Sequence, residues 1–166
     1  MPAITVAFSL AKGDRTQWAA AKLAELGIDR IVPLICDRTV VRPGDEGGRL
    51  RSLRLRRIVR EAAMQARLVH LPEVAEPCSS REAVAGGVAP PARLCIAEPG
   101  GEVPSLATPA ILVGPEGGWS CEELAIAAGE SIRPVALGTS VLRVETAAVV
   151  GGAILTALRS GLVRPV

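Results

Sequence analysis

The sequence alternates short apolar, β-prone runs with helical segments, and this alternation is the strongest constraint on its fold. Predicted strands cover Ile4–Leu10, Arg30–Cys36, Arg93–Ala97, Pro109–Val113 and Ile132–Leu137. Predicted helices cover Thr16–Leu26, Leu50–Arg67, Ser120–Ala128 and Val144–Arg159. Because Pro109–Val113 is almost entirely apolar, we expect a strand covered on both faces. The pattern predicts an α/β domain with a mostly parallel sheet and helices on both faces.

Composition excludes several functional classes. The 166 residues fit one domain, 1–166, and 49% hydrophobic residues exclude a disordered chain. Phe8, Trp18 and Trp119 are the only aromatic residues, too few for a platform that stacks single-stranded nucleic acid. The net charge of +2 excludes a globally basic surface, so any basic binding surface must be local.

Cysteine usage and hydropathy indicate the compartment. The four cysteines form no C-x-x-C pair, and His70 is the only histidine, so we expect no metal site and reduced thiols. The amino terminus has no basic leader, and the longest uncharged stretch, Thr146–Leu158, is too short to span a bilayer. These features predict a soluble cytoplasmic protein without a membrane segment.

The predicted helix over Leu50–Arg67 has two distinct faces. Its apolar residues fall on one side at 100° per residue, and an arginine stripe falls on the other. The stripe consists of Arg49, Arg56, Arg57, Arg60 and Arg67. Five like charges repel one another, and an anionic partner would relieve that cost. The stripe is therefore either a solvated surface or a contact for phosphates.

Glycine-rich loops follow the last two predicted strands. Gly114-Pro115-Glu116-Gly117-Gly118 follows Pro109–Val113, and Leu137-Gly138 ends the next strand. A third loop, Leu142–Thr146, opens the last helix. Ligands of open parallel sheets bind beyond the carboxyl ends of the strands, where glycine lets main-chain groups approach them. We therefore expect a ligand site here, and the alternative is that these loops are ordinary tight turns. The two common nucleotide-binding motifs, G-x-G-x-x-G and the P-loop, are absent from the sequence.

These loops resemble the signature of the SPOUT (α/β-knot) methyltransferases, and more narrowly the RsmE family, which methylates N3 of a uridine in 16S ribosomal RNA. The matching motifs are Leu112-Val113-Gly114-Pro115-Glu116-Gly117-Gly118, Leu137-Gly138 and Leu142-Arg143-Val144-Glu145-Thr146-Ala147. Upstream, Lys12-Gly13, Arg38 and Glu61-Ala62 match family positions in the same order. The resemblance covers nearly the whole chain.

The resemblance implies a carboxyl-terminal trefoil knot that holds S-adenosyl-L-methionine with main-chain groups. The cofactor-binding residues it implies are Leu112, Val113, Gly114, Glu116, Gly117, Leu137, Gly138, Leu142 and Arg143. It also implies a homodimer with the active site at the interface. The nearly all-apolar helix within Thr146–Leu158 agrees with this, the alternative being a helix buried within one subunit.

On the substrate side, the resemblance implies ribosomal RNA of the small subunit. An arginine near the uracil carbonyls would stabilise the anion that develops as N3 loses its proton, and we expect Arg143 in this role. A salt bridge from Arg143 to Glu145 or Glu116 is the alternative. Glu145 is the second candidate catalytic residue, and either glutamate is a candidate base. The candidate RNA contacts are Arg38, Arg56, Arg57, Arg60 and Arg67.

Relatives in this family usually carry an amino-terminal PUA-like β-barrel, whereas residue 4 of this chain already lies in the first predicted methyltransferase strand. We therefore expect residues 1–166 to form the methyltransferase domain alone. Two other functions stay open: a SPOUT enzyme acting on transfer RNA, and a cofactor-binding knot module without activity of its own.

Overall fold

The computed structural model describes residues 1–40 and 45–164, with the side chains of residues 45–48 excepted. Its strands form one sheet in which every pairing is parallel. The order is β3-β2-β1-β6-β5-β7, with β4 also pairing with β2. The strands are β1 (Thr5–Ser9), β2 (Arg30–Ile35), β3 (Glu73–Val74), β4 (Cys78–Ser79), β5 (Leu94–Glu102), β6 (Ala110–Val113) and β7 (Arg133–Val135).

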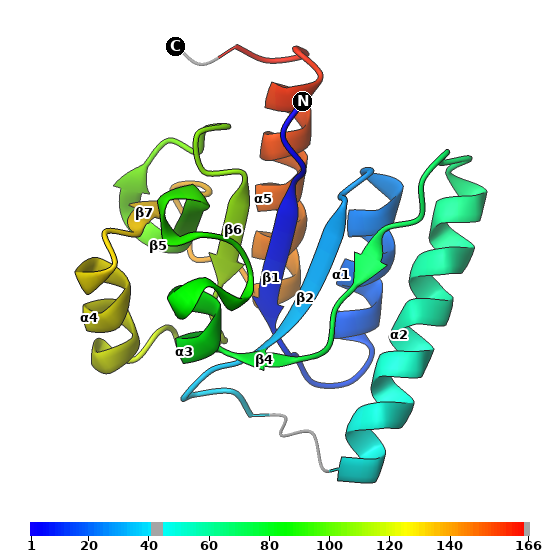
Figure 1. Cartoon of the computed structure of the whole chain (residues 1–166), viewed down its shortest axis with the longest axis horizontal. Coiled ribbons are helices and arrows are strands. Elements are labelled where there is room, and N and C mark those ends of the chain that lie inside the picture. Colours follow the sequence, from blue (N-terminus) through cyan, green and yellow to red (C-terminus); the bar gives the residue numbers. More distant parts are fainter. Residues whose placement is uncertain (41–44, 165–166) are drawn as a thin grey trace.

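Helices cover both faces of this sheet, so the predicted α/β class is confirmed. Figure 1 shows α5 running behind β1, with α3 and α4 on the opposite side. The helices are α1 (Arg15–Glu25), α2 (Asp45–Gln65), α3 (Ser80–Glu82), α4 (Cys121–Gly129) and α5 (Val144–Arg159). Two short turns complete the described elements, a π-helical one at Ala83–Gly87 and a 3-10 one at Pro91–Arg93.

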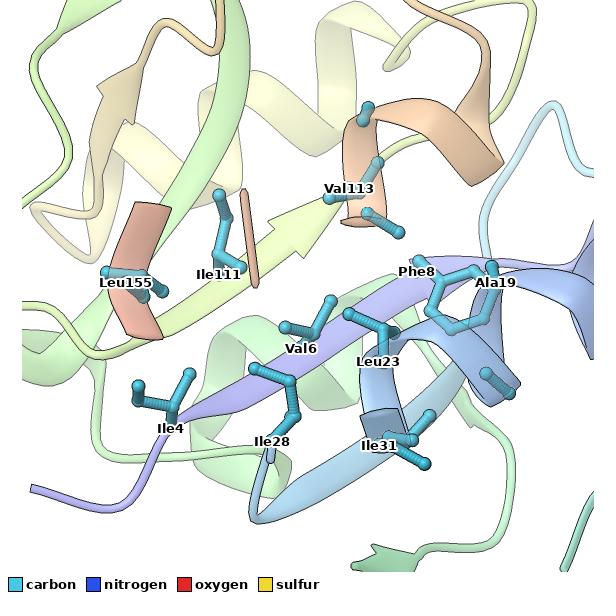
Figure 2. Close-up of a cluster of buried hydrophobic side chains, with 14 of the residues drawn as sticks. Ile4, Val6, Phe8, Ala19, Leu23, Ile28, Ile31, Ile111, Val113 and Leu155 are labelled. Atoms are coloured by element: carbon cyan, nitrogen blue, oxygen red, sulfur yellow. The ribbon is translucent and has the colours of Figure 1, made fainter. Parts of the chain in front are cut away.

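Strand β1 lies at the centre of the sheet and is buried along its whole length. Thr5 is in register with Arg30 of β2 and Ala110 of β6, so β1 has a neighbour on each side. Its side chains alternate between two cores, as the pleat of a strand requires. Val6 and Phe8 pack toward α1 and α5 in the cluster drawn in Figure 2, and Ala7 packs in the core on the opposite face.

Helix α2 packs on α1 and lies at the outer edge of the molecule (Figure 1). Leu55, Val59 and Ala63 are its buried apolar residues, spaced four apart along one face. Leu50, Leu53 and Met64 remain exposed. The predicted amphipathic helix is therefore present, and the arginines of the stripe are exposed, with Arg67 just beyond the end of the helix.

Some predicted boundaries differ from the structure. Helix α2 begins at Asp45 rather than Leu50 and ends at Gln65 rather than Arg67. Arg67 has a φ of 54°, the left-handed conformation that ends a helix. Its N–H donates to the Met64 carbonyl (3.1 Å), and the Leu68 N–H donates to the Ala63 carbonyl (3.0 Å). Strand β5 extends to Glu102, and the two-residue strands β3 and β4 were not predicted.

Two consecutive glycines let α5 approach the rest of the core. A Cβ atom on Gly152 would lie 2.7 Å from Leu23 Cδ2, and one on Gly151 would lie 3.0 Å from Ile111 Cδ1. Packing within one subunit thus explains both glycines. Part of the apolar surface of α5 stays only half-buried, namely Val149, Val150, Ala153, Ile154, Ala157 and Leu158.

The four cysteines are free, and they differ in their surroundings. Burial raises the pKa of the Cys95 thiol to about 11 and that of the Cys36 thiol to about 12, where the nearby Glu123 carboxylate adds to the effect. Cys121, by contrast, is exposed. None of the helices in the described ranges is long and apolar enough to cross a membrane.

The close packing of α5 gives a stability prediction. Gly152→Ala places a methyl group against the fully buried Leu23, and this overpacking outweighs the gain in helix propensity. We expect the free energy of unfolding in urea to fall by about 1 kcal/mol. The matched control, Gly129→Ala, has no atom within 4 Å of the new methyl and should leave stability unchanged or higher. Equal effects of the two substitutions would contradict the close approach.

Candidate functional site

A cavity of about 210 Å³ lies at the carboxyl edge of the sheet. Its walls come from the middle of β5, from the segments that follow β6 and β7, and from the first turn of α5. The lining residues are Ala97, Glu98, Pro99, Val113, Gly114, Pro115, Glu116, Gly118, Trp119, Leu137, Gly138, Ser140, Val141, Leu142, Val144 and Ala147. The structure therefore brings together the three loops that the sequence singled out.

Most of the residues expected to hold a cofactor line this cavity. They are Val113, Gly114, Glu116, Leu137, Gly138 and Leu142. Leu112, Gly117 and Arg143 are not among its lining residues. Leu112 neighbours Val113 on β6 and so faces the other side of the sheet, where it is buried with Ala7 and Trp119. Any contribution from Leu112 or Gly117 would have to come through the main chain.

Trp119 determines the shape of the glycine-rich loop. Its ring is 6% exposed, and its Nε1 donates a hydrogen bond to the Ala97 carbonyl at 3.1 Å. The ring lies so close to Gly114 that a Cβ there would be 2.7 Å from Trp119 Cε2. Glycine is required at position 114 for this reason. Sequence reasoning did not assign Trp119 to the site, although a lone tryptophan directly after Gly117-Gly118 was an available signal.

Arg38 holds the same loop from outside the cavity. Its Nη1 donates to the carbonyl oxygens of Gly117 (2.8 Å) and Trp119 (3.3 Å). Arg38 follows β2, so this contact links the end of β2 to the loop after β6. The residue was predicted as an RNA contact, and the structure places part of its guanidinium on main-chain oxygens of the loop.

The amino end of α4 carries a hydrogen-bonded network that supports this arrangement. Ser120 and Glu123 form a capping box, and Glu123 is 3% exposed. The Asp37 N–H donates to Glu123 Oε1 at 3.0 Å, and the Ser120 hydroxyl donates to Asp37 Oδ2 at 2.6 Å. The turn after β2 is thereby joined to α4 directly behind the glycine-rich loop.

Arg15, which the sequence did not single out, connects the site to α1. Its Nη1 pairs with Glu116 Oε1 and lies 3.9 Å from Glu145 Oε1. Glu145 is 8% exposed, and its second oxygen is buried with no hydrogen-bond partner among the residues that the structure describes. Among the described residues, the ion-pair partner of both glutamates is Arg15 rather than Arg143. The role of Arg143 stays a prediction.

Arg143 occupies the N-cap position of α5, between the cavity residues Leu142 and Val144. It is exposed, and within the described part of the chain it forms no ion pair. Glu145, by contrast, lies in the first turn of α5, where the helix dipole favours a negative charge. Of the two candidate catalytic residues, Arg143 is therefore free to meet a ligand, and Glu145 is held inside the protein.

The other predicted RNA contacts lie on or just after α2, away from the cavity lining. Arg56 pairs with Glu76, and Arg57 pairs with Glu61 at 2.8 Å one turn along the helix. Arg60 and Arg67 are exposed, with no ion pair among the described residues. Acidic neighbours thus partly neutralise the arginine stripe, and its contact with RNA stays a prediction.

Comparison with known families supports this description of the site. Residues 1–156 match the RNA methyltransferase domain family, and the chain belongs to that family. The domain is of the RsmE type within the SPOUT methyltransferases, as the sequence motifs predicted.

Similar proteins include two called ribosomal RNA small subunit methyltransferase E. The one from Synechocystis sp. is 33% identical over 165 residues, and the one from Mycobacterium bovis is 34% identical over 164 residues. The alignments cover 93% and 90% of this chain but 53% and 61% of those proteins. The chain therefore spans little more than half the length of these relatives.

Two solved structures share the fold, and the chain covers a larger share of each of them than of the two relatives above. A Legionella pneumophila protein in complex with the bound cofactor SAM has 31% identity and a TM-score of 0.83, covering 93% of this chain and 65% of that one. The ribosomal RNA small subunit methyltransferase E of Neisseria gonorrhoeae, bound to S-adenosyl methionine, has 29% identity and a TM-score of 0.79, covering 95% of this chain and 65% of that one.

The Trp119 contact predicts the effect of a single methyl group. Gly114→Ala forces the indole or the loop to move, because Trp119 is buried and hydrogen-bonded to β5. We expect the affinity for S-adenosylmethionine, measured by calorimetry, to fall at least about tenfold, or 1.4 kcal/mol. Gly117→Ala is the control in the same loop, because its new methyl group would lie 3.5 Å from the Arg38 side chain, an ordinary van der Waals distance. An equal loss in both variants would contradict the role given to Trp119.

Proposed function

We propose that the cavity binds S-adenosyl-L-methionine and that this chain transfers its methyl group to N3 of a uridine in 16S ribosomal RNA. The observation that carries the proposal is the meeting of three family loops around one cavity at the carboxyl edge of the sheet. The solved relatives with this cofactor bound, and the relatives named for small-subunit ribosomal RNA, support it.

The residues of the cavity suit this cofactor. Gly118 and Gly138 leave main-chain groups open to a ligand, because they carry no side chain and have nothing within 4 Å of the Cβ position. Val113, Leu137 and Leu142 offer apolar surface for a base, and Glu116 and Glu98 add negative charge for a positively charged ligand. S-adenosylmethionine carries an adenine that suits the apolar surface and a sulfonium that suits the negative charge. When bound, it supplies an electrophilic methyl group.

The main task of the protein is then to orient the uridine and manage its N3 proton. Arg143 is exposed beside the cavity, and its guanidinium would stabilise negative charge on the uracil carbonyls. Glu116 lines the cavity with its side chain 44% exposed, so we assign it, rather than Glu145, to accept the N3 proton. Glu145 acts as a positioning residue, because it faces Arg15, the partner of Glu116.

The same proposal includes a trefoil knot and a homodimer. The family motifs support the knot. The half-buried apolar surface of α5, from Val149 to Leu158, supports a second copy, because a partner could bury it further. Small-subunit ribosomal RNA is the proposed macromolecular substrate, and the exposed Arg60 and Arg67 are available for its phosphates.

Methyl transfer from radiolabelled S-adenosylmethionine tests the substrate. We expect label in 16S RNA of 30S subunits, at N3 of a uridine, when the modified base is mapped. Label confined to bulk transfer RNA would support the alternative SPOUT substrate. Cofactor binding without transfer to either RNA would support the non-catalytic module.

Arg143 can be tested separately from cofactor binding. Removing a donor that stabilises a developing anion typically costs 10²–10³ in rate, so Arg143→Ala should lower the single-turnover rate about 100-fold. The dissociation constant for S-adenosylmethionine should change less than about threefold, since the side chain does not line the cavity. Arg93→Ala removes the same charge at the opposite edge of the sheet and should leave both values unchanged. An unaltered rate in Arg143→Ala would exclude this role.

A further inference from the structure

A second and larger cavity, of about 480 Å³, lies beside the first. It is bounded by the loop after β1, the first turn of α1 and the amino-terminal half of α2. Its lining residues are Leu10, Ala11, Lys12, Gly13, Asp14, Thr16, Gln17, Pro33, Leu50, Arg51, Ser52, Arg54, Leu55 and Pro77. Neither the family motifs at the carboxyl end of the chain nor the proposed mechanism uses this space.

The two cavities open at the same edge of the sheet. Strands β1 and β6 are parallel neighbours, with Phe8 in register with Val113, so the loops that follow them start side by side. Arg15 joins these loops directly: its Nε donates to the Lys12 carbonyl at 3.1 Å, while its Nη1 pairs with Glu116. A ligand in the second cavity would therefore lie next to the wall of the first.

The charge of the second cavity indicates an anionic ligand. Among the side chains that the structure describes, Lys12, Arg51 and Arg54 line it, against one carboxylate, Asp14. Arg54 lies 3.7 Å from Asp14, whereas Lys12 and Arg51 are exposed and form no ion pair among the residues that the structure describes. Like charges gathered around one cavity repel one another, and a phosphate between them would remove that cost.

The remaining wall indicates what else the ligand carries. Leu10, Pro33, Leu55 and Pro77 give apolar surface on which a sugar or base can lie. The cationic surface also extends beyond the cavity, because Arg60 is exposed further along α2. A surface longer than the cavity favours a polynucleotide over a free mononucleotide.

We propose that this second cavity binds a nucleotide of the RNA substrate that flanks the target uridine, with its phosphate on Lys12 and Arg51 and its sugar or base on the apolar wall. The inference rests on the proposed function and adds an RNA subsite to it. The subsite holds the flanking nucleotide at the carboxyl end of β1, so that the neighbouring uridine can reach the mouth of the cofactor cavity after β6.

The first test removes Lys12 and Arg51 together. In Lys12→Ala/Arg51→Ala, we expect affinity for a 16S RNA fragment, measured by fluorescence anisotropy near 0.15 M salt, to fall at least about tenfold. The slope of log affinity against log salt should decrease by about 0.7, the contribution of one phosphate contact to a single strand. Affinity for S-adenosylmethionine should stay within about twofold.

The matched control for this variant is Arg93→Ala/Arg133→Ala, which removes the same charge. Arg93 precedes β5 and Arg133 begins β7, both at the amino edge of the sheet, far from the loop after β1. Its RNA affinity and salt slope should match the wild type. Equal losses in the two double variants would mean that only net charge matters, and would overturn the subsite.

The second test predicts tighter binding, which a damaged fold cannot mimic. Asp14 forms no side-chain cap to α1, so Asp14→Asn costs little stability. The substitution removes the negative charge of Asp14 and frees Arg54, so RNA affinity should rise about threefold. Glu130→Gln, at the exposed end of α4, is the control and should change nothing. Unchanged affinity in Asp14→Asn would also overturn the subsite.

Two further outcomes separate this inference from the proposed function. If uridine 5′-monophosphate alone competes as well as the RNA fragment, the cavity is a mononucleotide site and the RNA subsite is wrong. If the wild-type protein methylates 16S RNA while the Lys12→Ala/Arg51→Ala variant binds RNA as tightly as the wild type, the subsite is refuted but the proposed function is not. Wild-type protein that binds S-adenosylmethionine but no ribosomal RNA refutes the proposed function, and the subsite with it.

Discussion

The burial of β1 between two parallel neighbours is the constraint on which the rest of the structure depends. Because β1 is covered on both faces and paired on both edges, the loops after β1, β2 and β6 are forced to one edge of the sheet. Both cavities lie at that edge, and Arg15 and Arg38 reach the glycine-rich loop from it. The site is therefore a consequence of strand order more than of any one motif.

Close approach, rather than flexibility, explains the glycines that matter most. Gly114 leaves room for the ring of Trp119, and Gly152 leaves room for Leu23 beneath α5. Hydrogen bonds from Trp119 to Ala97 and from Arg38 to the loop then hold the main chain in place. A loop fixed in this way presents its main-chain groups without reorganisation, which is what selective binding of a small cofactor requires.

Local patterns predicted the elements and the three loops, because hydropathy periods and glycine positions are properties of adjacent residues. They did not predict Arg15, which meets Glu116 from 101 residues away, because a contact of that range leaves no local trace. The same holds for Arg38, assigned to RNA from its family position yet bonded in part to the loop carbonyls. The end of α2 was misplaced because Arg67, a non-glycine residue, adopts the left-handed conformation that glycine would have signalled.

The central claim is that the cavity after β6 is the cofactor site, and Trp119 can report on it directly. The chain has two tryptophans, and Trp18 lies half-exposed on α1, so Trp18→Phe leaves Trp119 as the sole emitter. Titration with S-adenosylmethionine should change its emission along a saturable curve, with S-adenosylhomocysteine competing, at one site per chain by calorimetry. Binding heat without any change in Trp119 emission, or no binding at all, would contradict the account.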